Sequence, residues 1–96
     1  MANEIIDIEE FARAGKNVPK GATYRIRIDK QNYEVSTSTL TGKEILDLAG
    51  KTPETYLLYL HLKGGQTRAI KATDSVDLTE PGIERFSTMK IENTEG

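Results

Sequence analysis

The sequence predicts an α+β fold, in which one helix packs on one face of a mixed sheet of about five strands. Three observations predict it. Two early segments alternate apolar and polar residues, as strands with one solvent-facing side do. A short amphipathic segment with a capping signal at its start comes next. Three further strand-like segments complete the folded part of the chain.

Residues 1–22 are predicted to form an N-terminal arm, made of a short helix and a linker. Asp7 can cap this helix and Gly15 can end it. A helix this short is marginal in water on its own, so we expect the arm either to dock on something or to fray. Its apolar residues recur at helical spacing: Ile5, Ile8 and Phe11.

The next segment predicts a β-hairpin. The run "TYRIRID" alternates apolar and basic side chains, "DKQN" makes a tight turn, and "YEVST" returns as a second strand. The outward basic residues of the first strand have two interpretations. Arg25 and Arg27 form either a small basic patch for a partner or simply the solvated face of a half-buried strand.

The clearest local signal is the helix within "TLTGKEILDLAGK". Thr41 and Glu44 have the spacing of a capping box, in which each side chain bonds the backbone amide of the other residue. Leu40 and Ile45 have the spacing of a hydrophobic staple across the same end. Gly50 supplies the stop.

Three strands are predicted after the helix. The first, "YLLYLHL", is almost wholly apolar, and its pattern leaves open which side chains face outward. An exposed apolar face on a small domain marks a candidate partner surface. The two possible outward sets are Leu57, Tyr59 and His61, or Leu58, Leu60 and Leu62.

A glycine turn, "KGGQ", leads from that strand into a shorter one, "TRAI". Val76 and Leu78 are expected to fill the core from the irregular segment that follows. The tripeptide "EPG" suits a type II turn because proline fixes φ and glycine accepts a positive φ. The last strand, "IERFSTMKI", is predicted to alternate, with Phe86 facing inward.

The order strand, strand, helix, strand, strand, strand has a single helix to cover one face of the sheet. It matches a β-grasp arrangement over residues 23–90, in which the first and last strands lie parallel at the centre. The C-terminal residues, 91–96, are then expected to leave from the middle of the sheet as a flexible tail.

Composition excludes several functional classes. The formal net charge of −2 gives no electrostatic reason to expect nucleic acid or a membrane surface as partner. Without cysteine there is no disulfide, thiolate nucleophile or cysteine-bound zinc. No segment approaches the ~18 apolar residues of a membrane span, and "MANEIIDIEE" does not resemble a secretory signal. We expect a cytoplasmic protein.

No catalytic or metal-binding constellation is recognisable. His61 is the only histidine, and the carboxylates form no pair with partners that mark a general acid and base. The "KGG" at residues 63–65 lacks the spacing of a phosphate-binding loop. We therefore expect no enzyme, no metal site and no cofactor.

Two stretches, "TGKEILDLAG" and "DLTEPGIERF", carry most of a resemblance to the bacterial multi-ubiquitin family, which are ubiquitin-like β-grasp protein modifiers. The resemblance covers about residues 5–90, and the lead-in "IEEFARAGKNVP" is similar to the segment before each family domain. The family is often built as tandem copies, and this chain holds one copy.

The resemblance implies a modifier conjugated through its C-terminal residue, Gly96. It implies as partners an ATP-using activating-type enzyme, a conjugating-type enzyme, an isopeptidase-like peptidase and a target protein, in a bacterial system of antiphage defence. From Lys90 to Gly96 an extended chain reaches about 23 Å. The tail read by the enzymes would comprise Met89, Lys90, Ile91, Glu92, Asn93, Thr94 and Glu95.

A second hypothesis belongs to another functional class. The chain would be a non-conjugated β-grasp module that binds or assembles, with its N-terminal arm docking on a neighbouring copy. Its self-association residues would be Ile5, Ile8 and Phe11.

Overall fold

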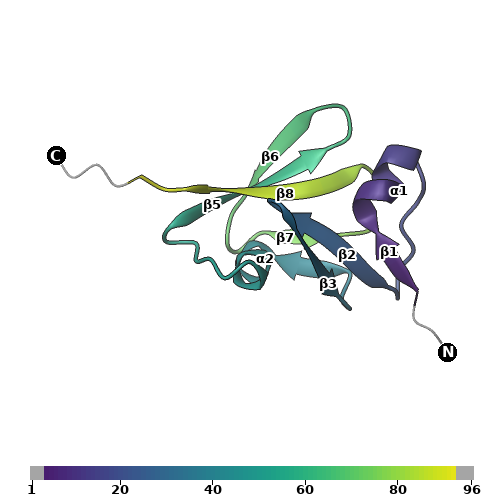
Figure 1. Cartoon of the computed structure of the whole chain (residues 1–96), viewed down its shortest axis with the longest axis horizontal. Helices are drawn as coiled ribbons and strands as arrows, with labels where there is room; N and C mark the ends of the chain where they lie inside the picture. The colour runs from purple at the N-terminus through teal and green to yellow at the C-terminus, as the bar shows by residue number, and fades with distance from the viewer. Residues whose placement is uncertain (1–3, 93–96) are drawn as a thin grey trace.

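The computed structural model describes residues 4–92, and it confirms the α+β class with its mixed sheet. Within these residues it has two helices, the short one predicted for the N-terminal segment and the one predicted within the domain (Figure 1). In chain order the elements are β1 (Ile5–Asp7), α1 (Ile8–Ala14), β2 (Thr23–Ile28), β3 (Gln31–Val35), β4 (Thr39–Thr41), α2 (Gly42–Leu48), β5 (Tyr56–Leu62), β6 (Gln66–Ile70), β7 (Ser75–Asp77) and β8 (Ile83–Lys90).

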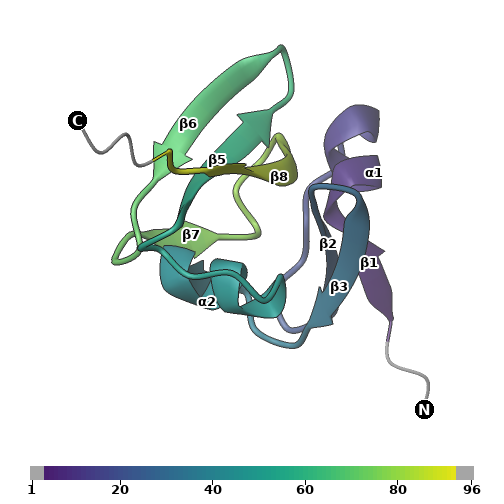
Figure 2. The ribbon, with the colours of Figure 1, turned by 60° about the vertical axis from the view of Figure 1, so that its left-hand side comes forward.

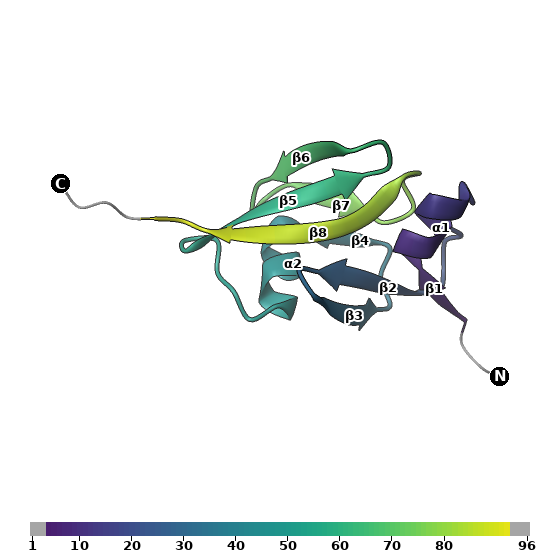
Figure 3. The same ribbon diagram turned by 45° about the horizontal axis from the view of Figure 1, so that its top comes forward.

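The main sheet has six strands in the path β1-β2-β8-β5-β6, with β3 added along β2. Figure 3 shows β8 between β5 and β2, at the centre of the sheet. β2 and β8 are parallel, as the β-grasp arrangement predicts, and β5 is antiparallel to β8. A separate two-stranded sheet joins β4 to β7, although the segment that contains β7 was expected to be irregular.

Helix α2 covers one face of the curved sheet, with the β2–β3 and β5–β6 hairpins on either side of it (Figure 2). The predicted capping box is present: the Thr41 hydroxyl accepts from the Glu44 amide at 3.2 Å, and the Glu44 carboxylate accepts from the Thr41 amide at 2.8 Å. Ile45 and Leu46 lie on the inner face of α2 and are buried. The local signal in the sequence therefore fixes where this helix starts and which face it buries.

The N-terminal segment forms part of the same core, so of the two outcomes expected for the arm, docking or fraying, the structure shows docking on the domain. β8 meets β2 only at the pair Phe86 and Ile28, so the start of β2 has a free edge. β1 pairs in parallel with that edge, and α1 then packs against β8 and β2 (Figure 3). Ile6 and Ile8 are each 1% exposed, so β1 and α1 fill the wedge where the two central strands diverge.

The last strand departs from simple alternation near its start. The pairing of β5 with β8 shifts register between His61 and Leu62, where Leu62 faces Ile83 and His61 faces Arg85. The extra residue, Glu84, is a β-bulge, which turns the preceding side chain to the other face. Ile83 and Phe86 are therefore both buried, although strict alternation would place them on opposite faces.

Candidate functional site

The candidate site is the place where the C-terminal segment leaves the folded body. Beyond the rest of the sheet, β8 continues beside only the first residues of β5, with Lys90 opposite Tyr56 and Met89 opposite Leu57 (Figure 1). The Ile91 amide then donates to the Thr55 carbonyl at 2.8 Å. The chain is therefore held to the body as far as Ile91.

Exposed apolar side chains gather at this exit. Four large apolar residues are exposed within residues 4–92, and Leu57, Met89 and Ile91 are three of them, at 43%, 57% and 36%. Met89 is the cross-strand partner of Leu57, and Ile91 lies two residues further, the spacing that returns an extended chain to the same face. We call these three residues the tail-root patch. Such a gathering on a small domain is typical of a partner surface.

The structure decides the open question about the β5 register. Leu58 and Leu60 are 2% and 0% exposed and face the core. The outward set is therefore Leu57, Tyr59 and His61.

A hydrogen-bonded pair lies further along the outward face of β5. His61 Nε2 and Ser87 Oγ of β8 are 2.7 Å apart. Partial burial, together with the positive charge of Arg85, lowers the pKa of His61, although Glu84 opposes the shift. A lowered pKa favours the neutral imidazole at pH 7.

A polar cluster that the sequence analysis missed anchors the opposite edge of β8. The Asp29 carboxylate accepts hydrogen bonds from the Thr88 amide and hydroxyl at 2.9 and 2.6 Å. Lys51 lies 3.0 Å from the same carboxylate. Asp29 is separated from these partners by 22 and 59 residues, so no local motif in the sequence reveals the cluster.

A model of the multiubiquitin family matches residues 24–91, from the start of β2 to Ile91, whose amide bonds Thr55. The chain belongs to the multiubiquitin family. No curated protein and no solved structure matched it. The matched range contains β2 to β8 and the whole tail-root patch, whereas β1 and α1 precede it. The fold is accordingly a ubiquitin-like β-grasp.

The two arginines predicted for the partner surface of this multiubiquitin domain are both engaged in ion pairs. Arg25 lies 3.3 Å from Glu34 of β3, and Arg27 lies 3.2 Å from Glu9 of α1. The Arg25–Glu34 pair is exposed and contributes little stability, whereas Glu9 in the Arg27 pair is mostly buried, with its side chain 13% exposed. The structure therefore does not add a free basic patch to the outward face of β5.

The arm residues predicted for self-association are divided between core and surface. Ile8 is buried and Phe11 is half-buried against the core, whereas Ile5 is 42% exposed. Most of the apolar side chains that make this segment amphipathic therefore pack against the core of the same multiubiquitin chain. Self-association through Ile8 would require this segment to leave its own sheet.

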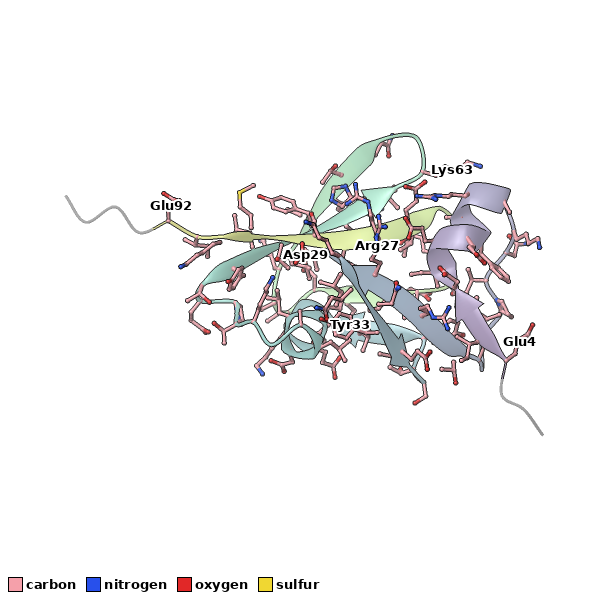
Figure 4. All side chains as sticks on the ribbon, viewed as in Figure 1. Glu4, Arg27, Asp29, Tyr33, Lys63 and Glu92 are labelled. Carbon is pink, nitrogen blue, oxygen red and sulfur yellow. The ribbon has the colours of Figure 1, made fainter. Side chains whose placement is uncertain are left out.

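The remaining predicted site residues lie along the tail. Met89 to Glu92 are described, and Glu92 lies at the opposite end of the molecule from Glu4 (Figure 4). Asn93, Thr94, Glu95 and the predicted conjugation point Gly96 lie outside the described residues.

Two classes of site find no support in the part of the chain that the structure describes. No group of three or more histidine or acidic residues is placed to hold a metal ion within residues 4–92. Neither helix in that range has the length and hydropathy required to cross a membrane.

Proposed function

We propose that this multiubiquitin-family chain is a protein modifier that is activated at Gly96 and conjugated to a target protein. The Gly96 carboxylate would attack the α-phosphate of ATP on an activating-type enzyme, which releases pyrophosphate and forms an acyl adenylate. An enzyme cysteine thiolate then displaces AMP to give a thioester. A cysteine of a conjugating-type enzyme exchanges with this thioester and releases the first enzyme's thiol. A nucleophile on the target then takes the acyl group and releases the second thiol. An isopeptidase-like peptidase would hydrolyse the bond between the modifier and its target.

The observation that carries the proposal is the tail root. The central strand of the sheet continues past the body, is anchored as far as Ile91, and is flanked there by the exposed patch of Leu57 and Met89. An enzyme that takes up the tail would meet this patch at the entrance to its own active site. The arrangement therefore supports recognition of the body and delivery of the terminus at one place.

The chain contributes reach rather than a catalytic group. Five residues follow Ile91 in the sequence, and an extended chain of that length spans about 17 Å. Glycine has no Cβ, so its carbonyl can pass through a narrow channel and remain open to attack. These properties supply what adenylation and thioester transfer require of the modifier.

The test combines the full chain with ATP, magnesium and an activating-type enzyme from the same genome, and it measures intact mass. We expect the adenylate, and then an enzyme-bound thioester that thiols cleave. Removal of Gly96 should abolish both products. Asn17→Ala, in the linker after α1, is the matched control and should react as the unmodified chain does. Adduct formation that survives removal of Gly96 would refute the assignment of that residue.

A second candidate, a non-conjugated assembly module, is favoured by the exposure of Ile5 on β1 at 42%. Light scattering of the full chain over a hundredfold concentration range tests it. This candidate predicts a mass that rises with concentration and that falls back in Ile5→Ser. A constant monomer mass would remove it.

A further inference from the structure

The strand that carries the C-terminal segment loses one of its neighbours before it leaves the body. The Asp29 amide donates to the Phe86 carbonyl at 2.9 Å, and at this point β2 turns through Asp29 and Lys30 into β3. From Thr88 onward, the edge of β8 that faced β2 has no part of β2 beside it. A strand end paired on one side only frays more readily than one paired on both.

The Asp29 side chain occupies this edge in place of a strand, and Figure 4 shows the residue beside β8. Its Oδ1 accepts from the Thr88 amide at 2.9 Å, and its Oδ2 accepts from the Thr88 hydroxyl at 2.6 Å. The Lys51 ammonium donates to Asp29 Oδ2 at 3.0 Å and to Thr88 Oγ1 at 2.9 Å. It also lies 4.7 Å from the centre of the Tyr56 ring, on the strand that flanks the other edge of β8. The cluster therefore joins the hairpin turn, the loop after α2 and the tail strand.

The turn at Asp29 requires a left-handed backbone, which glycine, asparagine and aspartate all accept, so the turn alone does not require a carboxylate there. Asp29 has φ 57°, and it is the one non-glycine residue with a positive φ within residues 4–92. Glycine adopts this conformation without steric cost, whereas other residues do so rarely. Glycine at this position would leave the turn intact, but it would leave the Thr88 amide without its acceptor.

The charges and hydrogen bonds around Asp29 favour its ionised carboxylate. Partial burial raises the pKa of Asp29, but the hydrogen bonds from Thr88 and the charge of Lys51 outweigh it and hold the pKa below its usual value. Lys30, Tyr33 and Tyr56 line the same groove, and Lys30 is a second cation on that side.

We infer that Asp29 is a positioning residue for the C-terminal segment, because its carboxylate clamps β8 at Thr88 and so fixes where, and in which direction, the tail leaves the body. This inference rests on the proposed function and deepens it. The enzyme would then meet the tail at a fixed position relative to the tail-root patch. The clamp acts at Thr88, and the Ile91–Thr55 bond acts on the other edge three residues later.

The chain offers a matched control for this clamp. Asp77 accepts hydrogen bonds from the amide and the hydroxyl of Thr79, at 2.9 and 2.6 Å, as Asp29 does from Thr88, although both Asp77 bonds reach a single oxygen. Asp77 is the last residue of β7, and its side chain bonds Thr79 rather than a residue of β8. Asp77→Asn therefore removes an equivalent carboxylate without touching the tail.

The first experiment measures amide hydrogen exchange and backbone relaxation by NMR on the full-length chain. In Asp29→Asn we expect exchange at Thr88 about tenfold faster, since the acceptor loses its charge and one of its two oxygens becomes an amide NH2, and faster motion at Met89 to Glu92. Exchange at core amides of β2 and β5 should change much less, and Asp77→Asn should leave Thr88 within twofold. Unchanged protection and motion at these residues would overturn the clamp. Thr88→Val, which removes only the hydroxyl bonds, gives a milder variant if Asp29→Asn does not fold.

The second experiment separates positioning from general stability and from the proposed function. With an activating-type enzyme, we expect Asp29→Asn to raise the KM for the chain about fivefold in adenylate formation, with kcat within twofold, because the reacting carboxylate is unaltered. Asp77→Asn should change neither constant. A KM that stays constant while Thr88 protection is lost would overturn the positioning role. If the unmodified chain forms no adenylate, the modifier proposal fails, while the NMR result still decides whether Asp29 clamps the strand.

Discussion

Replacing Ile8 with alanine tests whether β1 and α1 are an integral part of the fold. Ile8 is 1% exposed and packs in the core with Tyr24 and Phe86. Truncation of a buried isoleucine to alanine costs about 2–5 kcal/mol of unfolding free energy, which includes the cavity left behind. A domain of this size has about 5–15 kcal/mol in total, so Ile8→Ala should remove a large share. A loss of about 3 kcal/mol lowers the urea midpoint by roughly 2 M at an m-value of about 1.5 kcal/mol/M.

The matched control is Ile5→Ala, three residues earlier in the same segment. Ile5 is 42% exposed, so we expect its truncation to cost less than about 1 kcal/mol. Both variants are measured by urea denaturation at 25 °C, followed by circular dichroism. If Ile8→Ala costs no more than Ile5→Ala, the segment is detached in solution and the packing described above does not hold there.

Three further predictions follow from single contacts. A Cβ at Gly42 would lie far inside van der Waals contact of the Lys71 carbonyl oxygen, so Gly42→Ala should cost about 1–3 kcal/mol of unfolding free energy; a neutral result in urea denaturation would contradict the close packing of α2 on the loop after β6. Because the folded-state pKa of Asp29 is lowered, its stabilisation is present above the unfolded pKa of about 3.9 and is lost as the pH falls through the folded value. In Asp29→Asn the free energy of unfolding should accordingly fall less steeply as the pH decreases in the acid range. An unchanged slope would contradict the stabilising role of the Asp29 carboxylate. Leu57→Ser should slow thioester formation several-fold and leave the thermal midpoint within about 3 °C, since the side chain is 43% exposed; equal rates would exclude the tail-root patch from recognition.

Those parts of the fold whose determinants lie close together in the chain could be predicted from the sequence. The capping box needs only Thr41 and Glu44, three residues apart, and it formed as expected. The caps of α1 at Asp7 and Gly15 are equally local, and both are present. The turn before β8 likewise has Gly82 at φ 88°, as the type II turn requires.

The parts that could not be predicted depend on pairing between distant segments. The strand β1 is three residues long, and its partner edge on β2 is free only because β8 diverges from β2. The bulge at Glu84 depends on the register of β8 against β5. The outward face of β5 could not be chosen because Leu57 and Leu58 are equally apolar, and only the position of α2 distinguishes them.

The tail-root patch exposes apolar side chains on a strand that must still avoid pairing with another chain. Exposed apolar side chains on a strand with a free edge invite pairing with another chain. Here Lys90 and Glu92 alternate with Met89 and Ile91, and both charged residues are exposed. The clamp at Thr88 occupies the first free amide on that edge. Because the Thr88 amide is occupied and charged residues follow it while the face stays open, we expect a partner to approach the patch through its side chains rather than by adding a strand, over the outward face of β5.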